Sequence, residues 1–77
     1  MINENIAKPM HPADIKAEIQ KAGTSQAEIA RELDVSKTVI NNVIYGRMTS
    51  RRIAECIAEK IKKTLDEIWP DKYTEAA

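Results

Sequence analysis

Residues 25–40 read SQAEIARELDVSKTVI, and this run contains the start signals of two short helices. Ser25 followed by Glu28 is a capping box ahead of apolar residues, which predicts a helix over residues 26–33. Ser36 can cap a second helix, because its hydroxyl can accept a hydrogen bond from a free backbone N–H group of the first turn. Only the dipeptide Asp-Val separates the first helix from Ser36. The sequence therefore predicts two helices joined by a tight turn.

The second of these helices, predicted over residues 36–45, has one apolar face and one polar face. Ile40, Val43 and Ile44 recur at helical spacing and form the face that must be buried. Gly46 can end the helix in a left-handed conformation. The run is rich in β-branched residues, which is also typical of a strand, but its spacing and the preceding cap favour a helix.

Three further helices are predicted around this pair. The first begins at Pro12, which suits the first position of a helix, and stops at Gly23. The fourth follows a cap at Ser50, and isoleucines repeating every four residues give it a buried face. The fifth is short, begins with a capping box at Thr64 and ends before Pro70. No strand is predicted, so the expected fold class is all-α, a compact five-helix domain.

Length and composition limit the chain to one small domain. A chain of 77 residues with 43% hydrophobic and 31% charged residues is typical of a globular protein with a single core. We expect that domain to span residues 11–73, between a flexible arm at residues 1–10 and a frayed tail at residues 74–77. No apolar run approaches the roughly 18 residues of a membrane span, and the N-terminus lacks the apolar stretch of a signal peptide. We therefore expect a cytoplasmic protein without a membrane partner.

The cysteine and histidine content excludes two common means of stabilising a small domain. One Cys cannot form an internal disulfide, and one Cys with one His cannot supply the four ligands of a structural zinc site. We expect packing alone to hold the core, without a cofactor or metal, and self-association would help so small a domain. His11 is expected to start the first helix without a catalytic role, and Cys56 to be a small buried hydrophobe. Trp69 and Tyr73 are expected to close the core or support a subunit contact.

Charge is unevenly distributed along the chain, although the net charge is zero. Residues 1–34 and residues 53–77 each contain four Lys or Arg against six Asp or Glu. The stretch between them has no acidic residue and contains four cations: Lys37, Arg47, Arg51 and Arg52. This single-sign stretch predicts one basic surface on an otherwise mixed molecule.

A tight pair of short helices, the second with an exposed polar face, is what insertion of a helix into the major groove of duplex DNA requires. The polar face predicts five base-reading residues, namely Lys37, Thr38, Asn41, Asn42 and Tyr45. Lys can donate to guanine, Asn can pair with adenine, and the methyl group of Thr can pack on that of thymine.

Contacts with DNA backbone phosphates are predicted for a second set of residues, which flank the base-reading ones. Its members are Gln26, Ser36, Arg47, Thr49, Ser50, Arg51 and Arg52. These residues are expected to position the protein on DNA rather than to read its sequence. Ser36, like Ser25, is expected to be a helix cap first and a DNA contact second.

The run at residues 25–40 resembles the bipartite helix-turn-helix signature of phage-repressor-like regulators. The resemblance extends over nearly the whole chain through MHPADIKA at residues 10–17, AGTS at residues 22–25 and IWPDKY at residues 68–73. These pieces, in this order, are similar to the Ner/Nlp family of DNA-binding regulators from transposable phages and enterobacteria. The closing Ile-Trp-Pro-x-x-Tyr is the most specific of them.

The resemblance implies a lambda-repressor-like five-helix fold and a repressor of phage or mobile-element promoters. It also implies that Lys37, Thr38 and Asn42 contact bases. The chain differs from the wider signature at Asp34, where glycine is usual. Asp tolerates left-handed geometry at a modest energetic cost, so this difference weakens the turn only slightly.

Three other classes of function fit the sequence less well. An enzyme is disfavoured because there is no glycine-rich phosphate loop, second histidine or nucleophile–base motif, and no small-molecule substrate is expected. A helix-turn-helix interaction module, such as an antitoxin-like protein, would need a partner-binding segment, for which only the short ends of the chain are available. A helical adaptor without DNA binding agrees with the neutral net charge but not with the polar face of residues 36–45. The expected partner is therefore operator DNA, and a homodimer on that DNA is compatible with the small domain.

Overall fold

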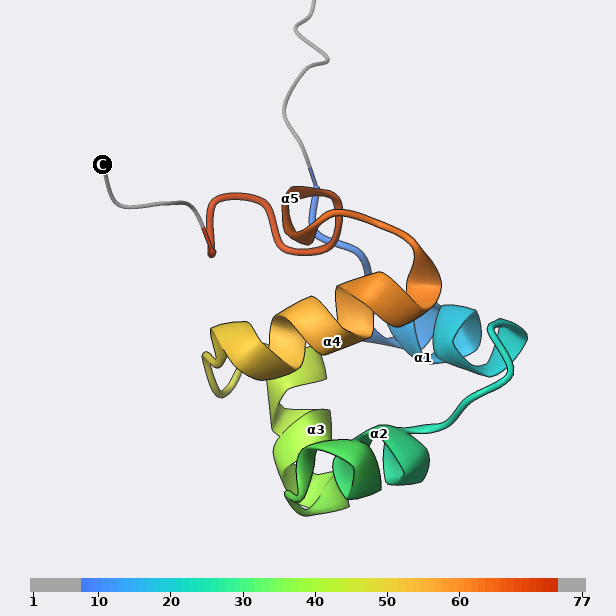
Figure 1. The fold of residues 1–77 in the computed structure, drawn as a ribbon. Coiled ribbons are helices and arrows are strands. Elements are labelled where there is room, and N and C mark those ends of the chain that lie inside the picture. The colour runs from blue at the N-terminus through green and yellow to red at the C-terminus, as the bar shows by residue number, and fades with distance from the viewer. Residues whose placement is uncertain (1–7, 74–77) are drawn as a thin grey trace, which may run out of the picture.

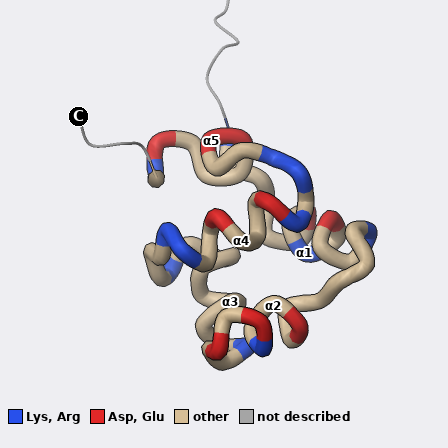
Figure 2. The backbone as a smooth tube through the Cα atoms, in the orientation of Figure 1, with Lys and Arg blue, Asp and Glu red and all other residues tan. Residues whose placement is uncertain are grey.

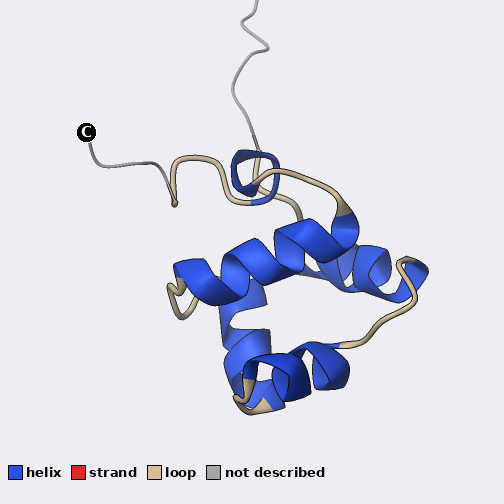
Figure 3. Ribbon diagram, in the orientation of Figure 1, coloured by secondary structure: helices blue, strands red, loops and turns tan. Residues whose placement is uncertain are grey.

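The computed structural model describes residues 8–73, which fold into five α-helices (Figure 1). They are α1 (Pro12–Lys21), α2 (Gln26–Leu33), α3 (Lys37–Ile44), α4 (Arg51–Ile61) and α5 (Leu65–Ile68). No strand occurs within these residues (Figure 3). The predicted all-α, five-helix fold is therefore confirmed.

The longest helix, α4, organises the molecule, because it packs against each of the other four. In Figure 1, α2 and α3 lie on one side of α4, and α5 lies on the other. α2 and α3 also pack directly against each other. In this arrangement, α4 and α2 both support α3.

The helices begin where side chains satisfy free backbone N–H groups, as the sequence predicts. The hydroxyl oxygens of Ser25, Ser36, Ser50 and Thr64 each accept a hydrogen bond from the N–H group three residues later. At α5 the full capping box is present, since the Glu67 carboxylate also accepts from the Thr64 N–H group at 2.7 Å. α1 is capped by the ring of His11, whose Nδ1 accepts from the Ala13 N–H group at 3.0 Å. The prediction placed His11 at this helix start but did not foresee its cap.

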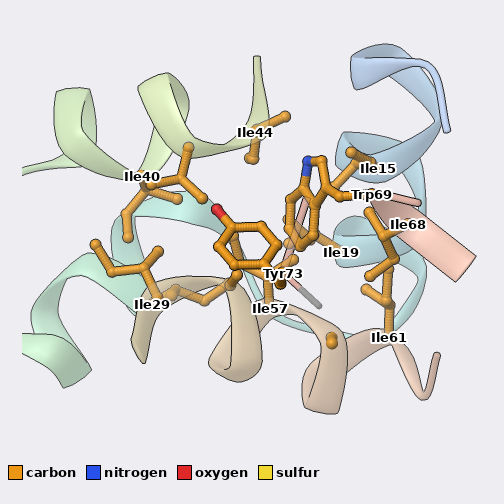
Figure 4. Packing of buried hydrophobic residues seen from close by; sticks show 14 of the residues in the cluster. Ile15, Ile19, Ile29, Ile40, Ile44, Ile57, Ile61, Ile68, Trp69 and Tyr73 are labelled. Carbon is orange, nitrogen blue, oxygen red and sulfur yellow. The ribbon is translucent and has the colours of Figure 1, made fainter. Parts of the chain in front are cut away.

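The core is built mainly from isoleucine and is closed by two aromatic rings (Figure 4). Every helix contributes at least one buried isoleucine. Trp69 and Tyr73 meet edge to face with their ring centroids 5.5 Å apart, and both are buried, so their predicted role in closing the core is confirmed. Cys56 differs from expectation, because it lies half-buried at the margin of the core rather than inside it. Partial burial still raises the pKa of its thiol.

The ends of the domain can be compared with the predicted arm and tail only in part. Residues 1–7, most of the predicted arm, and residues 74–77, all of the predicted tail, lie outside the described residues. Met10, predicted to belong to the arm, packs against the core, and its N–H group donates to the Ile68 carbonyl oxygen at 3.0 Å. Met10 is therefore part of the packed domain rather than of a loose arm. Among residues 8–73, no helix has the length and apolar character needed to cross a membrane.

Candidate nucleic-acid interface

The turn between α2 and α3 is set by one residue in a left-handed conformation. Asp34 has φ 61° and ψ 45°, and its N–H group bonds to carbonyl oxygens in the last turn of α2. The Val35 N–H group donates to the Ala30 carbonyl oxygen at 2.9 Å, which completes the helix end. Ser36 then caps α3 at once. The tight turn predicted from Asp-Val is thus formed, and Asp serves where glycine is usual.

The turn presents α3 with its apolar side inward and its polar side outward. Ile40, Val43 and Ile44 are buried. The five predicted base-reading residues lie on the other side, with Lys37, Thr38 and Tyr45 exposed and Asn41 and Asn42 half-buried. Tyr45 ends the helix and is the one large hydrophobic side chain that is exposed among the described residues, at 41%. The structure therefore brings all five together on one accessible face.

An open groove of about 410 Å³ runs beside the first half of this face. It is lined by Lys16, Gln26, Lys37, Thr38 and Asn41. The groove joins a predicted phosphate contact, Gln26, to three of the predicted base-reading residues. The Gln26 Oε1 atom is buried and has no hydrogen-bond partner among the described residues. Two cations and no acidic residue line the groove.

The second half of the face is organised around the ring of Tyr45. The Lys16 ammonium donates to the Tyr45 hydroxyl at 2.8 Å and lies 4.6 Å from the ring centroid. The Arg47 guanidinium lies 4.9 Å from the same centroid, and its Nη1 atom donates to the Asn42 Oδ1 atom at 3.3 Å. Both cations are within the range of cation–π attraction. Tyr45 therefore holds a cation from α1 and a cation from the α3–α4 loop on the polar face of α3.

Lys16 is the residue of this surface that the sequence did not indicate. It belongs to the acidic first part of the chain and lies 29 residues from Tyr45. In the sequence, the basic surface is indicated by the acid-free stretch of residues 35–52, and α1 is outside that stretch. The helical period does place Lys16 beside Ile15 at the edge of the buried face of α1, but its partner follows only from the packing of the helices.

Four of the other five predicted phosphate contacts have partners within the protein. Ser36 and Ser50 cap α3 and α4. Arg51 bonds to the Glu55 carboxylate at 3.1 Å and to the Tyr73 carbonyl oxygen at 3.0 Å. Arg52 donates to the Leu33 carbonyl oxygen at 2.9 Å, which joins the start of α4 to the end of α2. Thr49 is exposed in the α3–α4 loop.

Ion pairing distinguishes the cations of the α3 face from several cations elsewhere. Lys16, Lys37 and Arg47 form no ion pair with any of residues 8–73. By contrast, Lys60 meets Glu32 at 2.9 Å, and this hydrogen-bonded carboxylate raises the pKa of the Lys60 ammonium. Figure 2 shows further basic residues where the α3–α4 loop enters α4. The uncompensated cations beside α3 give this face a positive potential that suits an anionic partner.

Metal binding has no support in the described part of the chain, where no group of three or more His, Cys, Asp or Glu residues is placed to hold an ion. The chemistry of the α3 face is instead that of hydrogen-bond donors and acceptors beside cations. Such a combination reads base edges and contacts phosphates.

Comparison with known proteins agrees with this geometry. Residues 9–77 match the model of a family described as winged helix-turn-helix DNA-binding. The chain is also 33% identical over 63 residues to a protein of Escherichia phage D108 described as a negative regulator of transcription, and the match covers 82% of this chain and 84% of that protein. No β-hairpin wing is present within residues 8–73, so the described residues offer DNA only helices and loops. Because these two matches cover most of the chain, it belongs to the winged helix-turn-helix DNA-binding family.

Proposed function

We propose that this chain is a sequence-specific repressor that inserts α3 into the major groove of duplex DNA. The observation that carries the proposal is the exposed polar face of α3, which is flanked by cations without acidic partners among the described residues. The family match supports DNA binding. Repression is supported by the phage relative described as a negative regulator of transcription.

Base recognition is assigned to Lys37, Thr38, Asn41, Asn42 and Tyr45 on that face. Lys37 projects from the first turn of α3 and is free to donate to guanine. Asn42 accepts from Arg47 through Oδ1. A carbonyl oxygen has two lone pairs, so the amide of Asn42 can still form the paired contact with adenine. Arg47 would then fix the orientation of the amide before DNA arrives.

Phosphate contacts are assigned first to Gln26 and Arg47, whose side chains lie beside the base-reading residues. Thr49 remains an exposed candidate in the loop. Ser36, Ser50, Arg51 and Arg52 already have protein partners. We propose that these four contribute to DNA binding mainly by holding α3 and α4 in place.

The biological target that we propose is a promoter of a phage or another mobile element, controlled in the cytoplasm. The pieces MHPADIKA and IWPDKY support a place near the Ner/Nlp regulators within the wider family. A symmetric operator read by two copies of the chain is part of this proposal, because paired half-sites are the usual arrangement for helix-turn-helix proteins.

Selection from a pool of random duplexes at two salt concentrations tests the proposal. We expect the wild type to enrich a shared half-site, and duplicated half-sites at fixed spacing if two copies bind. Thr38→Ala and Asn42→Ala should each relax the preference at one or two base pairs, with a loss of about 1–3 kcal/mol in discrimination. Lys63→Ala is the control, because Lys63 lies between α4 and α5, away from the helix-turn-helix.

The outcome that would contradict the proposal is the absence of any enriched sequence at low salt. Equal relaxation by Lys63→Ala would also count against reading by α3. Repression is tested separately, by placing the enriched sequence across a reporter promoter and measuring transcription with and without the protein. Increased transcription would reject the repressor assignment and retain DNA binding.

A further inference from the structure

Lys16 is held in a defined position at the edge of the α3 face, although it belongs to α1. Its ammonium donates to the Tyr45 hydroxyl at 2.8 Å, and it forms no ion pair with a described residue. A neutral hydroxyl orients an ammonium without cancelling its charge. The ammonium has three N–H donors, and Tyr45 uses one of them.

The surroundings of Lys16 suit an anion. Lys16 lines the groove of about 410 Å³ with Lys37, and the other lining residues are uncharged. A second groove, of about 350 Å³, lies beside it and is also lined by Lys16 and Lys37 without any acidic residue. Two ammonium groups therefore face one open surface that lacks negative charge. Because the chain has zero net charge, a surface with two ammonium groups and no acidic residue must result from how the fold distributes the charges.

We propose that Lys16 contacts a backbone phosphate of the bound DNA and that Tyr45 positions its ammonium to do so. This inference rests on the proposed function and extends the interface to α1. The phosphate lies on the strand that passes beside the first half of α3, where Lys16 and Lys37 share the groove. In this role Tyr45 acts through Lys16, and the role is separate from the base contact proposed for the Tyr45 side chain.

The advantage of the Tyr45 contact is that it orders a long side chain before DNA binds. A free Lys loses rotamer freedom when it is fixed against a phosphate, and this entropy loss weakens binding. The hydroxyl and ring of Tyr45 already restrict Lys16 in the free protein. Removing the hydroxyl should therefore weaken binding without removing the charge that meets the phosphate.

The dependence of affinity on salt tests the phosphate contact directly. Each neutralised phosphate contributes about 0.9 to the slope of log affinity against log salt concentration. The probe is the duplex enriched by the wild type, with Kd measured between 50 and 200 mM salt. Over this fourfold range the wild type should lose about 3.5-fold more affinity than Lys16→Met. Lys21→Met is the matched control, since Lys21 lies on the same helix, is paired with Glu18 at 3.9 Å and should leave the slope unchanged.

The role of Tyr45 is tested by a double-mutant cycle with Lys16. Tyr45→Phe keeps the ring and removes the hydroxyl, so we expect a two- to threefold loss of affinity, on the order of 0.5 kcal/mol, with no change of slope. The same substitution should have no further effect in the Lys16→Met background. Thermal unfolding of each variant verifies that the fold is retained, and both side chains are accessible enough to be replaced without loss of the core.

Two results would overturn the inference while leaving the proposed function intact. One is a Lys16→Met slope equal to that of the wild type on the enriched duplex. The other is an equal effect of Tyr45→Phe in both backgrounds, which would mean that Tyr45 does not act through Lys16. A wild type that prefers no duplex would overturn both proposals, and this outcome is recognised before any variant is compared.

Discussion

Asp34 and Lys62 each end a helix in the left-handed conformation, with φ of 61° and 60°. For an L-residue this conformation costs roughly 1–2 kcal/mol, because the Cβ atom approaches a carbonyl oxygen. Asp is among the few residues that tolerate it, since a short polar side chain can form local hydrogen bonds. Lys has no such compensation. Two positions with the same backbone geometry therefore differ in strain.

Replacement of these residues by glycine should reveal that difference. We expect Lys62→Gly to raise the free energy of unfolding by about 1 kcal/mol, because removal of the Cβ atom outweighs the larger entropy of the unfolded chain. Asp34→Gly should raise it by about 0.5 kcal/mol or less, because less strain is relieved. Urea unfolding with linear extrapolation measures both values. A decrease for Lys62→Gly would show that the lysine side chain makes a stabilising contact that exceeds the backbone strain.

At the scale of single residues, sequence reasoning succeeded where the chemistry is local. The caps at Ser25, Ser36 and Ser50 were predicted, because each depends on neighbours within four residues. The left-handed geometry at Asp34 was expected only through the resemblance to a signature with glycine at that position. Lys62 could not be identified in the same way, since no local hydrogen bond of a lysine side chain favours the left-handed conformation.

Among the secondary-structure elements, the segment that follows α5 secures the loop between α3 and α4. The Ser50 N–H group donates to the Tyr73 hydroxyl at 3.3 Å, and Arg51 donates to the Tyr73 carbonyl oxygen. The Lys72 ammonium reaches the Gly46 carbonyl oxygen at 3.4 Å. These contacts hold both ends of a loop that carries Arg47 to the face of α3. The last residues of the domain thus support the candidate interface from a distance.

Tyr73→Phe should weaken this connection without disturbing the aromatic packing. The variant leaves the half-buried Ser50 N–H group without its partner, which should lower the free energy of unfolding by about 1 kcal/mol. Tyr45→Phe is the matched control, because its lost hydrogen bond is exposed and should change stability by less than about 0.5 kcal/mol. Equal midpoints of thermal unfolding for the two variants would contradict a structural role for the Tyr73 hydroxyl.

At the scale of elements, the number and order of helices were predictable and the contacts between them were not. Periodicity and caps identify a helix from its own residues, which is why all five were found. The pairing of Lys16 with Tyr45 joins residues 29 positions apart and depends on how α1 and α3 both pack against α4. For the same reason, the basic stretch did not indicate that the side chains of Arg51 and Arg52 bond to other parts of the protein.

For the molecule as a whole, stability depends on a small core around α4. A domain of 77 residues is expected to unfold with a free energy of roughly 4–12 kcal/mol. Ile57 is fully buried on α4, the helix that contacts all the others. A cavity at this position would therefore weaken the packing of α4 against α3. Core packing and DNA binding are linked through the same helix.

Ile57→Ala should lower the free energy of unfolding by about 2–5 kcal/mol, through lost burial and the cavity left behind. Its neighbour Cys56 is half-buried, so Cys56→Ala should cost about 1 kcal/mol or less and serves as the control. DNA that binds only the folded state adds about 2.7 kcal/mol at a hundred times its Kd. The enriched duplex should therefore raise the thermal midpoint of Ile57→Ala, whereas a scrambled duplex at equal salt should raise it far less. The enriched duplex could instead fail to raise the midpoint of Ile57→Ala although it still binds the wild type. The cavity must then have altered the α3 face itself, which would mean that α4 maintains the DNA-binding surface in addition to stabilising the fold.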